Sequence, residues 1–155
     1  MKRTLTAIFA AFALCISAQT AVGEPYEDTP DAATRDPDYA AGKAAMEKKN
    51  WPEAVKRFHQ AALRDPNSAD LQNYLGYSYR NLKQMDLAFK HYKRSIELNP
   101  RHRGAHEYIG EAYLLVNDLP SAEKHLALLR SICLLQCEEL ADLEKAIAAY
   151  KSKPK

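Results

Sequence analysis

The 155-residue sequence lacks the local patterns that most enzymes carry. It has only five glycines, and they form neither a nucleotide-binding fingerprint nor a phosphate-binding loop. No nucleophile, base and acid are spaced as a catalytic set, and the HExxH metal motif is missing. Asp and Glu are spread along the chain, as they are on solvated helix faces. The sequence therefore predicts a protein without catalytic chemistry and without a cofactor.

A strong charge of one sign is also missing. The formal net charge is +2, and it falls to about 0 if Lys2 and Arg3 are removed with the N-terminal segment described next. No basic face with interleaved stacking groups stands out, so we expect no nucleic-acid partner.

Long apolar runs are limited to one, Leu5 to Ile16. It follows the basic pair Lys2 and Arg3, and it is too short for a membrane span. Small residues then precede Glu24, so residues 1–23 are predicted to be a secretory signal peptide cleaved after Gly23, with Ala18 as second choice. An uncleaved anchor is the alternative. Signal cleavage predicts a periplasmic or secreted protein.

Cysteine is scarce, with three residues in the whole chain. Cys15 leaves with the signal peptide, so Cys133 and Cys137 remain. An even count in an oxidising compartment favours a disulfide. Residues four apart in an intact helix have Cβ atoms about 5–6 Å apart, whereas a disulfide needs about 3.5–4.5 Å. We therefore expect the helix to break between the two cysteines.

The sequence contains an internal repeat with a period of 34 residues. Gly42 aligns with Gly76 and Gly110, and Pro66 aligns with Pro100. Further matches at the same offset are Ala54, Ala88 and Ala122; Phe58 and Tyr92; Tyr79 and Tyr113. A gapless period of this length predicts stacked helical hairpins rather than a compact globule with a pocket.

The middle repeat resembles the tetratricopeptide repeat family. It reads Leu75-Gly76-x-x-Tyr79 and continues with Ala88, Tyr92 and Pro100. The resemblance covers roughly residues 35–134 and weakens in the outer repeats. Departures from the family pattern are Asp38, Ala41 and Ala45 in the first repeat and Leu126, Leu129 and Leu134 in the third. The resemblance implies an all-α solenoid of three helical hairpins.

The repeat pattern also assigns roles within the hairpins. Glycine at the same register inside each first helix costs about 1 kcal/mol relative to Ala, which implies the close approach of another helix backbone. Phe58 and Tyr92 are expected to fill the space between hairpins, and Pro66 and Pro100 to follow the second helices. Residues 138–150 have an amphipathic pattern, predicting a helix that caps the solenoid. Leu134 stands where a repeat proline is expected, so a Cys133–Cys137 crosslink is predicted to fix the angle of this cap.

These elements divide the chain into four parts. Residues 1–23 are the signal peptide, 24–36 an acidic flexible linker, 37–150 the helical domain with its cap, and 151–155 a basic tail.

The family resemblance implies partner binding in the concave groove that the first helices line. The candidates are Tyr39, Lys43, Asn73, Tyr77, Arg80, Asn81, Glu107 and Glu111. Tyr77 and Arg80 are the expected anchors. Some relatives hold a terminal carboxylate with Lys, Asn and Arg; Lys43 and Asn73 suit such a clamp, but Glu107 and Glu111 do not. We therefore expect a peptide with charges of both signs. An ordinary solvated inner face is the alternative.

The predicted function is that of an exported adaptor that binds a protein or peptide segment. Two alternatives belong to other classes. One is a periplasmic metal carrier that uses His102, His106 and the two thiols. The other is a self-association module, a possible homo-oligomer. The five histidines are more simply explained as solvated or hydrogen-bonded, since His91 and His125 are themselves one repeat apart.

Overall fold

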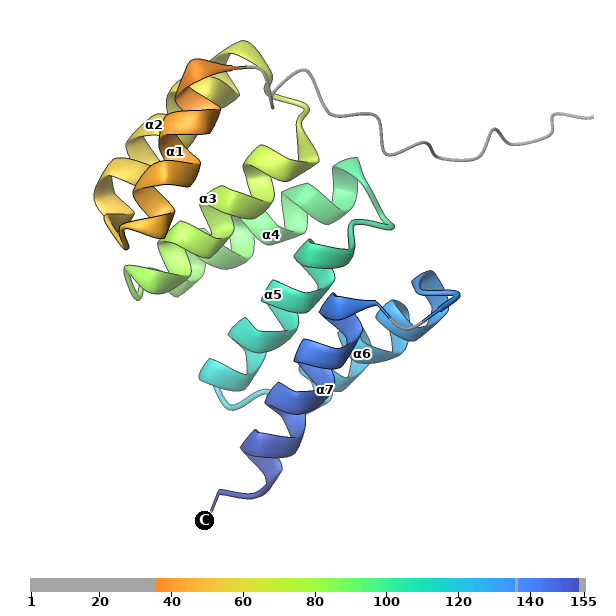
Figure 1. The fold of residues 1–155 in the computed structure, drawn as a ribbon. Coiled ribbons are helices and arrows are strands. Elements are labelled where there is room, and N and C mark those ends of the chain that lie inside the picture. Colours follow the sequence, from red (N-terminus) through yellow and green to blue (C-terminus); the bar gives the residue numbers. More distant parts are fainter. Residues whose placement is uncertain (1–35, 136, 154–155) are drawn as a thin grey trace, which may run out of the picture.

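A computed structural model describes residues 36–135 and 137–153, and within these ranges the chain forms seven helices and no strand. The helices are α1 (Pro37–Glu47), α2 (Trp51–Arg64), α3 (Ala69–Asn81), α4 (Met85–Leu98), α5 (Arg103–Leu115), α6 (Leu119–Ile132) and α7 (Glu138–Lys151). They pair as successive hairpins, with α7 last (Figure 1). This is the predicted all-α solenoid. The signal segment and residues 24–35 of the predicted linker lie outside the described residues.

Local chemistry explains where the helices begin and end. The side chain of Asp36 caps α1 by accepting hydrogen bonds from the backbone N–H groups of Asp38 and Tyr39. Ser68 caps α3 in the same way. Such caps satisfy N–H groups that have no partner inside the helix. Pro66 and Pro100 lie just after the ends of α2 and α4, where they were predicted.

The repeated glycines make room for side chains. A Cβ atom added to Gly42 would lie 2.6 Å from the ring of Phe58, and one added to Gly76 would lie 2.5 Å from the ring of Tyr92. The predicted close approach of a helix backbone at these positions is therefore wrong. In the first two hairpins the second helix inserts an aromatic ring against the first, and only Gly leaves enough space for it.

The hydrophobic core is divided among the hairpins. Phe58, Tyr92 and Leu129 are fully buried in three separate clusters. The third cluster contains Leu143 and Ile147 of α7, so the predicted cap does cover the last hairpin. Burial of a leucine-sized side chain contributes about 1.5–3 kcal/mol.

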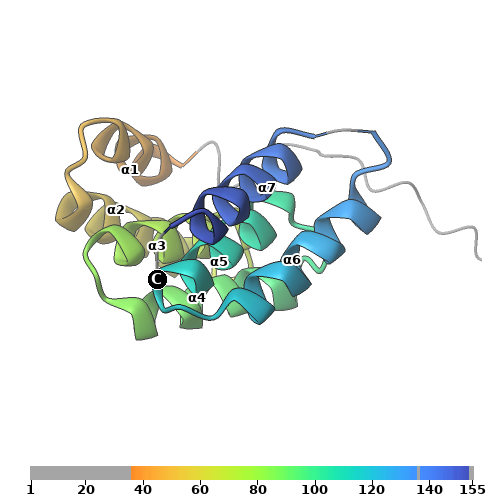
Figure 2. The ribbon, with the colours of Figure 1, turned by 90° about the horizontal axis from the view of Figure 1, so that it is seen from below.

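The helices form an inner and an outer layer. α1, α3 and α5 line one side, α2, α4 and α6 the other, and α7 lies over α5 on the same side as α1 (Figure 2). α1 and α7 therefore flank a concave surface whose floor is α3 and α5. No helix of the described part is both long and apolar enough to cross a bilayer.

Candidate protein-binding groove

A row of aromatic side chains runs from the start of α2 through α3 to α5. The ring centroids of Trp51 and Tyr77 are 5.8 Å apart in an edge-to-face arrangement, and those of Tyr77 and Tyr108 are 4.8 Å apart. All three side chains are half-buried. Aromatic pairs with this spacing stabilise one another by about 0.5–1.5 kcal/mol beyond the area they bury. The groove therefore has a rigid, partly apolar floor.

Arg80 holds this row together. Its guanidinium carbon lies 4.9 Å from the ring centroid of Tyr77 and 5.4 Å from that of Tyr108. One guanidinium nitrogen also donates to Glu111 Oε2 at 2.6 Å and to the carbonyl of Tyr108 at 3.2 Å. The Arg80 side chain is only 11% exposed. Arg80 therefore links α3 to α5 in the protein without a bound partner.

The first-repeat candidates lie at the α1 side of the groove. Lys43 Nζ donates to the hydroxyl of Tyr74 at 3.1 Å and lies 4.2 Å from the centre of its ring. Tyr39 packs edge-on against Phe58 and Tyr74, so part of its ring belongs to the core. Lys43 is thus the candidate in this repeat whose charge faces the groove.

The two asparagines of α3 have different surroundings. Asn81 is half-buried, and its amide donates to the carbonyl of Tyr77 at 2.9 Å. Asn73 is 3% exposed, and its side-chain oxygen has no hydrogen-bond partner among the described residues. A buried carbonyl oxygen without a partner is unusual.

Glu107 is covered by the cap helix. The side chain is 8% exposed. Burial, together with the nearby carboxylates of Glu111, Asp142 and Glu139, raises its pKa to about 8. Because Asp142 and Glu139 belong to α7, the cap lies over the acidic part of α5. Glu107 is therefore buried and Glu111 is paired with Arg80, so neither candidate offers an exposed, unpaired carboxylate to the groove.

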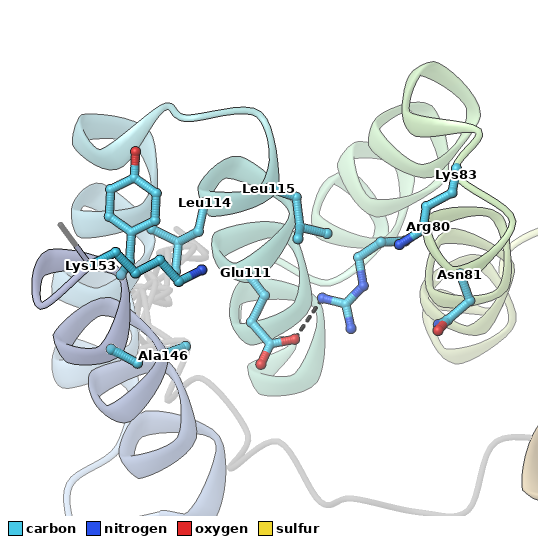
Figure 3. Close-up of a pocket in the computed structure, with 10 residues that line it drawn as sticks. Arg80, Asn81, Lys83, Glu111, Leu114, Leu115, Ala146 and Lys153 are labelled. Carbon is cyan, nitrogen blue, oxygen red and sulfur yellow. Dashed lines mark hydrogen bonds and ion pairs between the residues drawn. The ribbon is translucent and has the colours of Figure 1, made fainter. Parts of the chain in front are cut away.

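An open pocket lies where the C-terminal ends of α3, α5 and α7 meet, and we call it the end pocket. Its volume is about 350 Å³. α5 forms its floor, while α3 and α7 form its walls (Figure 3). It is lined by Arg80, Asn81, Lys83, Glu111, Leu114, Leu115, Ala146, Ala149, Tyr150 and Lys153. The groove thus ends in a distinct cavity that α7 creates.

Comparison with known proteins identifies the fold. A family model of the tetratricopeptide repeat matches residues 39–100. No curated protein sequence matches the chain. Residues 39–100 belong to the tetratricopeptide repeat family, and the described helices have its fold.

Solved structures of other tetratricopeptide repeat proteins have the same arrangement of helices. The TPR2B domain of yeast Sti1, solved as a complex with pHsp70, is 20% identical, with a TM-score of 0.69, over 77% of this chain and 95% of that one. The type III secretion translocator chaperone SycD of Yersinia enterocolitica is 20% identical, with a TM-score of 0.68, over 81% and 96%. PcrH in complex with the chaperone binding region of PopD is 22% identical, with a TM-score of 0.65, over 77% and 90%.

Cys133 and Cys137 lie at the turn before the cap. Cys133 ends α6 and Cys137 precedes α7, so the predicted helix break is present. The two are bonded in the structure, with Cα atoms 6.0 Å apart. Leu134 and Leu135, which lie between them, are 91% and 86% exposed. Oxidation of this pair in the cell stays a prediction.

The histidines of the metal-carrier alternative are engaged in structural hydrogen bonds. His102 caps α5 through Nδ1, and its Nε2 lies 2.9 Å from Asp70. His106 Nδ1 lies 3.0 Å from His125 Nδ1, and its Nε2 lies 3.0 Å from the carbonyl of Pro100. Within residues 36–135 and 137–153, no group of three or more His, Cys, Asp or Glu residues is arranged to hold a metal ion.

Some groove residues were not identified from the sequence. Trp51 begins a second helix, whereas the family resemblance places the groove on first helices, so the resemblance does not single it out. Leu115, Tyr150 and Lys153 were missed because the position of α7 relative to α5 is not encoded in the repeat period. Trp51 is the only tryptophan in the sequence, and the equivalent residues of the other repeats are Met85 and Leu119. This difference between the repeats is the signal in the sequence that points to Trp51 as a groove residue.

Proposed function

We propose that this tetratricopeptide repeat protein is an adaptor that holds a segment of another protein in its concave groove and carries out no chemistry of its own. The aromatic row of Trp51, Tyr77 and Tyr108 carries this proposal. Tyr and Trp offer large contact area at low cost in side-chain entropy. Arg80 holds the rings in place, so little ordering remains to oppose binding.

The proteins with a similar fold support this class of partner. The TPR2B domain of Sti1 was solved as a complex with pHsp70, and PcrH as a complex with the chaperone binding region of PopD. At 20–22% identity these structures establish the fold alone. What we propose for this chain is the binding mode, a protein segment lying across first helices.

The candidate residues then have two different roles. Lys43, Tyr77 and Asn81 are proposed to touch the partner because their side chains reach the groove surface. Arg80 and Glu111 position the aromatic row. Tyr39, Asn73 and Glu107 are proposed to support the groove floor, since they are largely committed to contacts within the chain.

Site-specific photo-crosslinking tests the proposal. A photoreactive side chain at Asn81 should capture a protein partner in the producing cells, whereas the same group at Lys56, exposed on the outer helix α2, should not. Tyr77→Ala should reduce the Asn81 adduct at least fivefold without changing helical content by circular dichroism. Equal adducts from Asn81 and Lys56 would show that the groove is ordinary surface.

We also propose that the protein acts outside the cytoplasm, in the periplasm or after secretion. The basic start, apolar run and small residues of 1–23 support this. N-terminal sequencing of the exported protein should find Glu24 first. Recovery of only the full-length chain from the cytoplasm would contradict export.

A further inference from the structure

We propose that the end pocket binds an apolar side chain of the partner that is followed within one or two residues by a carboxylate. This inference rests on the proposed function and specifies the chemistry of the partner at one end of the groove. Lys43 and Asn73, which suit a carboxylate clamp by sequence, do not line this pocket. The site therefore depends on α7.

The apolar part of the pocket comes from α5 and α7. Leu115 is 57% exposed, and in Figure 3 its side chain extends from α5 toward α3. Ala146 and Ala149 on α7 are small and leave the cavity open. The Tyr150 hydroxyl donates to Asn117 Oδ1 at 3.3 Å, which fixes this ring at the pocket wall. An apolar side chain placed here would cover Leu115, which is otherwise exposed to water.

The charged part of the pocket is positive. Glu111 and Arg80 neutralise each other through their 2.6 Å contact. Lys83 and Lys153 are exposed and form no ion pair with any described residue. Two uncompensated ammonium groups on opposite walls attract a carboxylate and repel a lysine or arginine. An Asp or Glu side chain and a chain terminus both present this carboxylate group.

Peptide binding to the purified protein tests this chemistry. The probes are fluorescein-labelled peptides measured by anisotropy: Ser-Gly-Ser-Leu-Glu-Asp with an amidated end, Ser-Gly-Ser-Leu-Leu with a free carboxylate, and Ser-Gly-Ser-Leu-Lys-Lys amide. We expect at least one carboxylate peptide to bind tenfold or more tightly than the lysine peptide. The carboxylate peptide that binds more tightly shows whether the pocket prefers an acidic side chain or a chain terminus. Equal affinity for all three, or no binding, would overturn the inference.

Variants locate the effect at the end pocket. Lys83→Glu combined with Lys153→Glu should weaken binding of the preferred peptide at least tenfold, and Leu115→Gln at least threefold. The matched control is Lys56→Glu combined with Lys124→Glu, which makes the same charge change at exposed positions on the outer helices α2 and α6. The control should bind normally. Equal losses in both pairs would indicate net charge alone and reject the pocket.

The two proposals fail in different ways. If the Asn81 crosslink depends on Tyr77 but Lys83→Glu with Lys153→Glu binds the acidic peptide normally, the groove function stands and the end-pocket inference is rejected. If the peptide selectivity is found but the Asn81 crosslink is not, the pocket chemistry stands, and the proposal that the aromatic row of the groove holds the partner is rejected.

Discussion

Leu143 of α7 lies directly against Gly110 of α5. A Cβ atom added at Gly110 would be 2.7 Å from Leu143 Cδ2. In the first two repeats the corresponding space is filled by Phe58 and Tyr92 from the same hairpin. The third repeat has Leu126 at that position, and the cap helix supplies the missing side chain. This substitution brings α7 onto α5 and so builds the end pocket.

The Gly110–Leu143 contact predicts strong coupling between the two positions. Leu143→Ala should lower the free energy of unfolding by about 2–5 kcal/mol, because Leu143 is fully buried. Gly110→Ala should also destabilise, because of the clash. The double variant should be more stable than the sum of the single effects, as measured in urea. Lys145→Ala, an exposed change on α7, is the control. Simple additivity would show that the contact is absent.

Lys49 is predicted to be a site where glycine stabilises the fold. Its φ is 54°, in the left-handed region, and Lys83 and Asn117 repeat this conformation one and two periods later. A side chain there costs roughly 1 kcal/mol. Lys49→Gly should therefore raise the melting temperature by a few degrees. Lys48→Gly, at φ −80°, should lower it, and a decrease in both variants would contradict the prediction.

Glu107 is predicted to destabilise the protein at alkaline pH. Its folded pKa is about 8 against a reference value of 4.5, so the unfolded state releases its proton first. The stabilisation that protonated Glu107 provides is fully present below pH 4.5 and is lost as the pH rises toward 8. Glu107→Gln should raise the melting temperature at pH 8–9 and have little effect near pH 4.5. Glu111→Gln should instead destabilise, since Arg80 then lacks its partner.

The histidines predict a loss of stability in acid. Burial lowers the pKa of His91 and of His125 to about 4, from a reference of 6.5. Both are therefore neutral in the folded state while the unfolded state takes up protons. The stabilisation that the two neutral histidines provide is fully present above pH 6.5. As the pH drops toward 4, the free energy of unfolding falls by up to about 1.4 kcal/mol per pH unit for each histidine. The wild-type melting temperature should fall over this range, and His91→Gln with His125→Gln should flatten the decrease.

The cysteines are predicted to be oxidised to each other in the exported protein. Thiol titration of unreduced, denatured protein should find no free thiol from Cys133 and Cys137. Reduction should lower the melting temperature by several degrees, since closing so short a loop gives about 2 kcal/mol. A double Ser variant should show the lower value with or without reductant. Two titratable thiols per chain would reject the disulfide.

The sequence determined the repeat, its helices and their ends. The 34-residue period, the capping residues and the prolines are local signals, because each acts within one or two helical turns. Cys133 and Cys137 likewise gave the break before the cap. The inner positions of Lys43, Tyr77 and Asn81 followed from register alone.

Only the tertiary structure decided what those inner residues are free to do. Arg80 looked like an anchor for a partner, but its pairing with Glu111 depends on how α3 and α5 pack. Glu107 is buried because α7, whose Leu143 fills the space beside Gly110, lies over this part of α5. Such long-range packing has no period in the sequence, since it depends on volumes contributed by residues more than thirty positions apart.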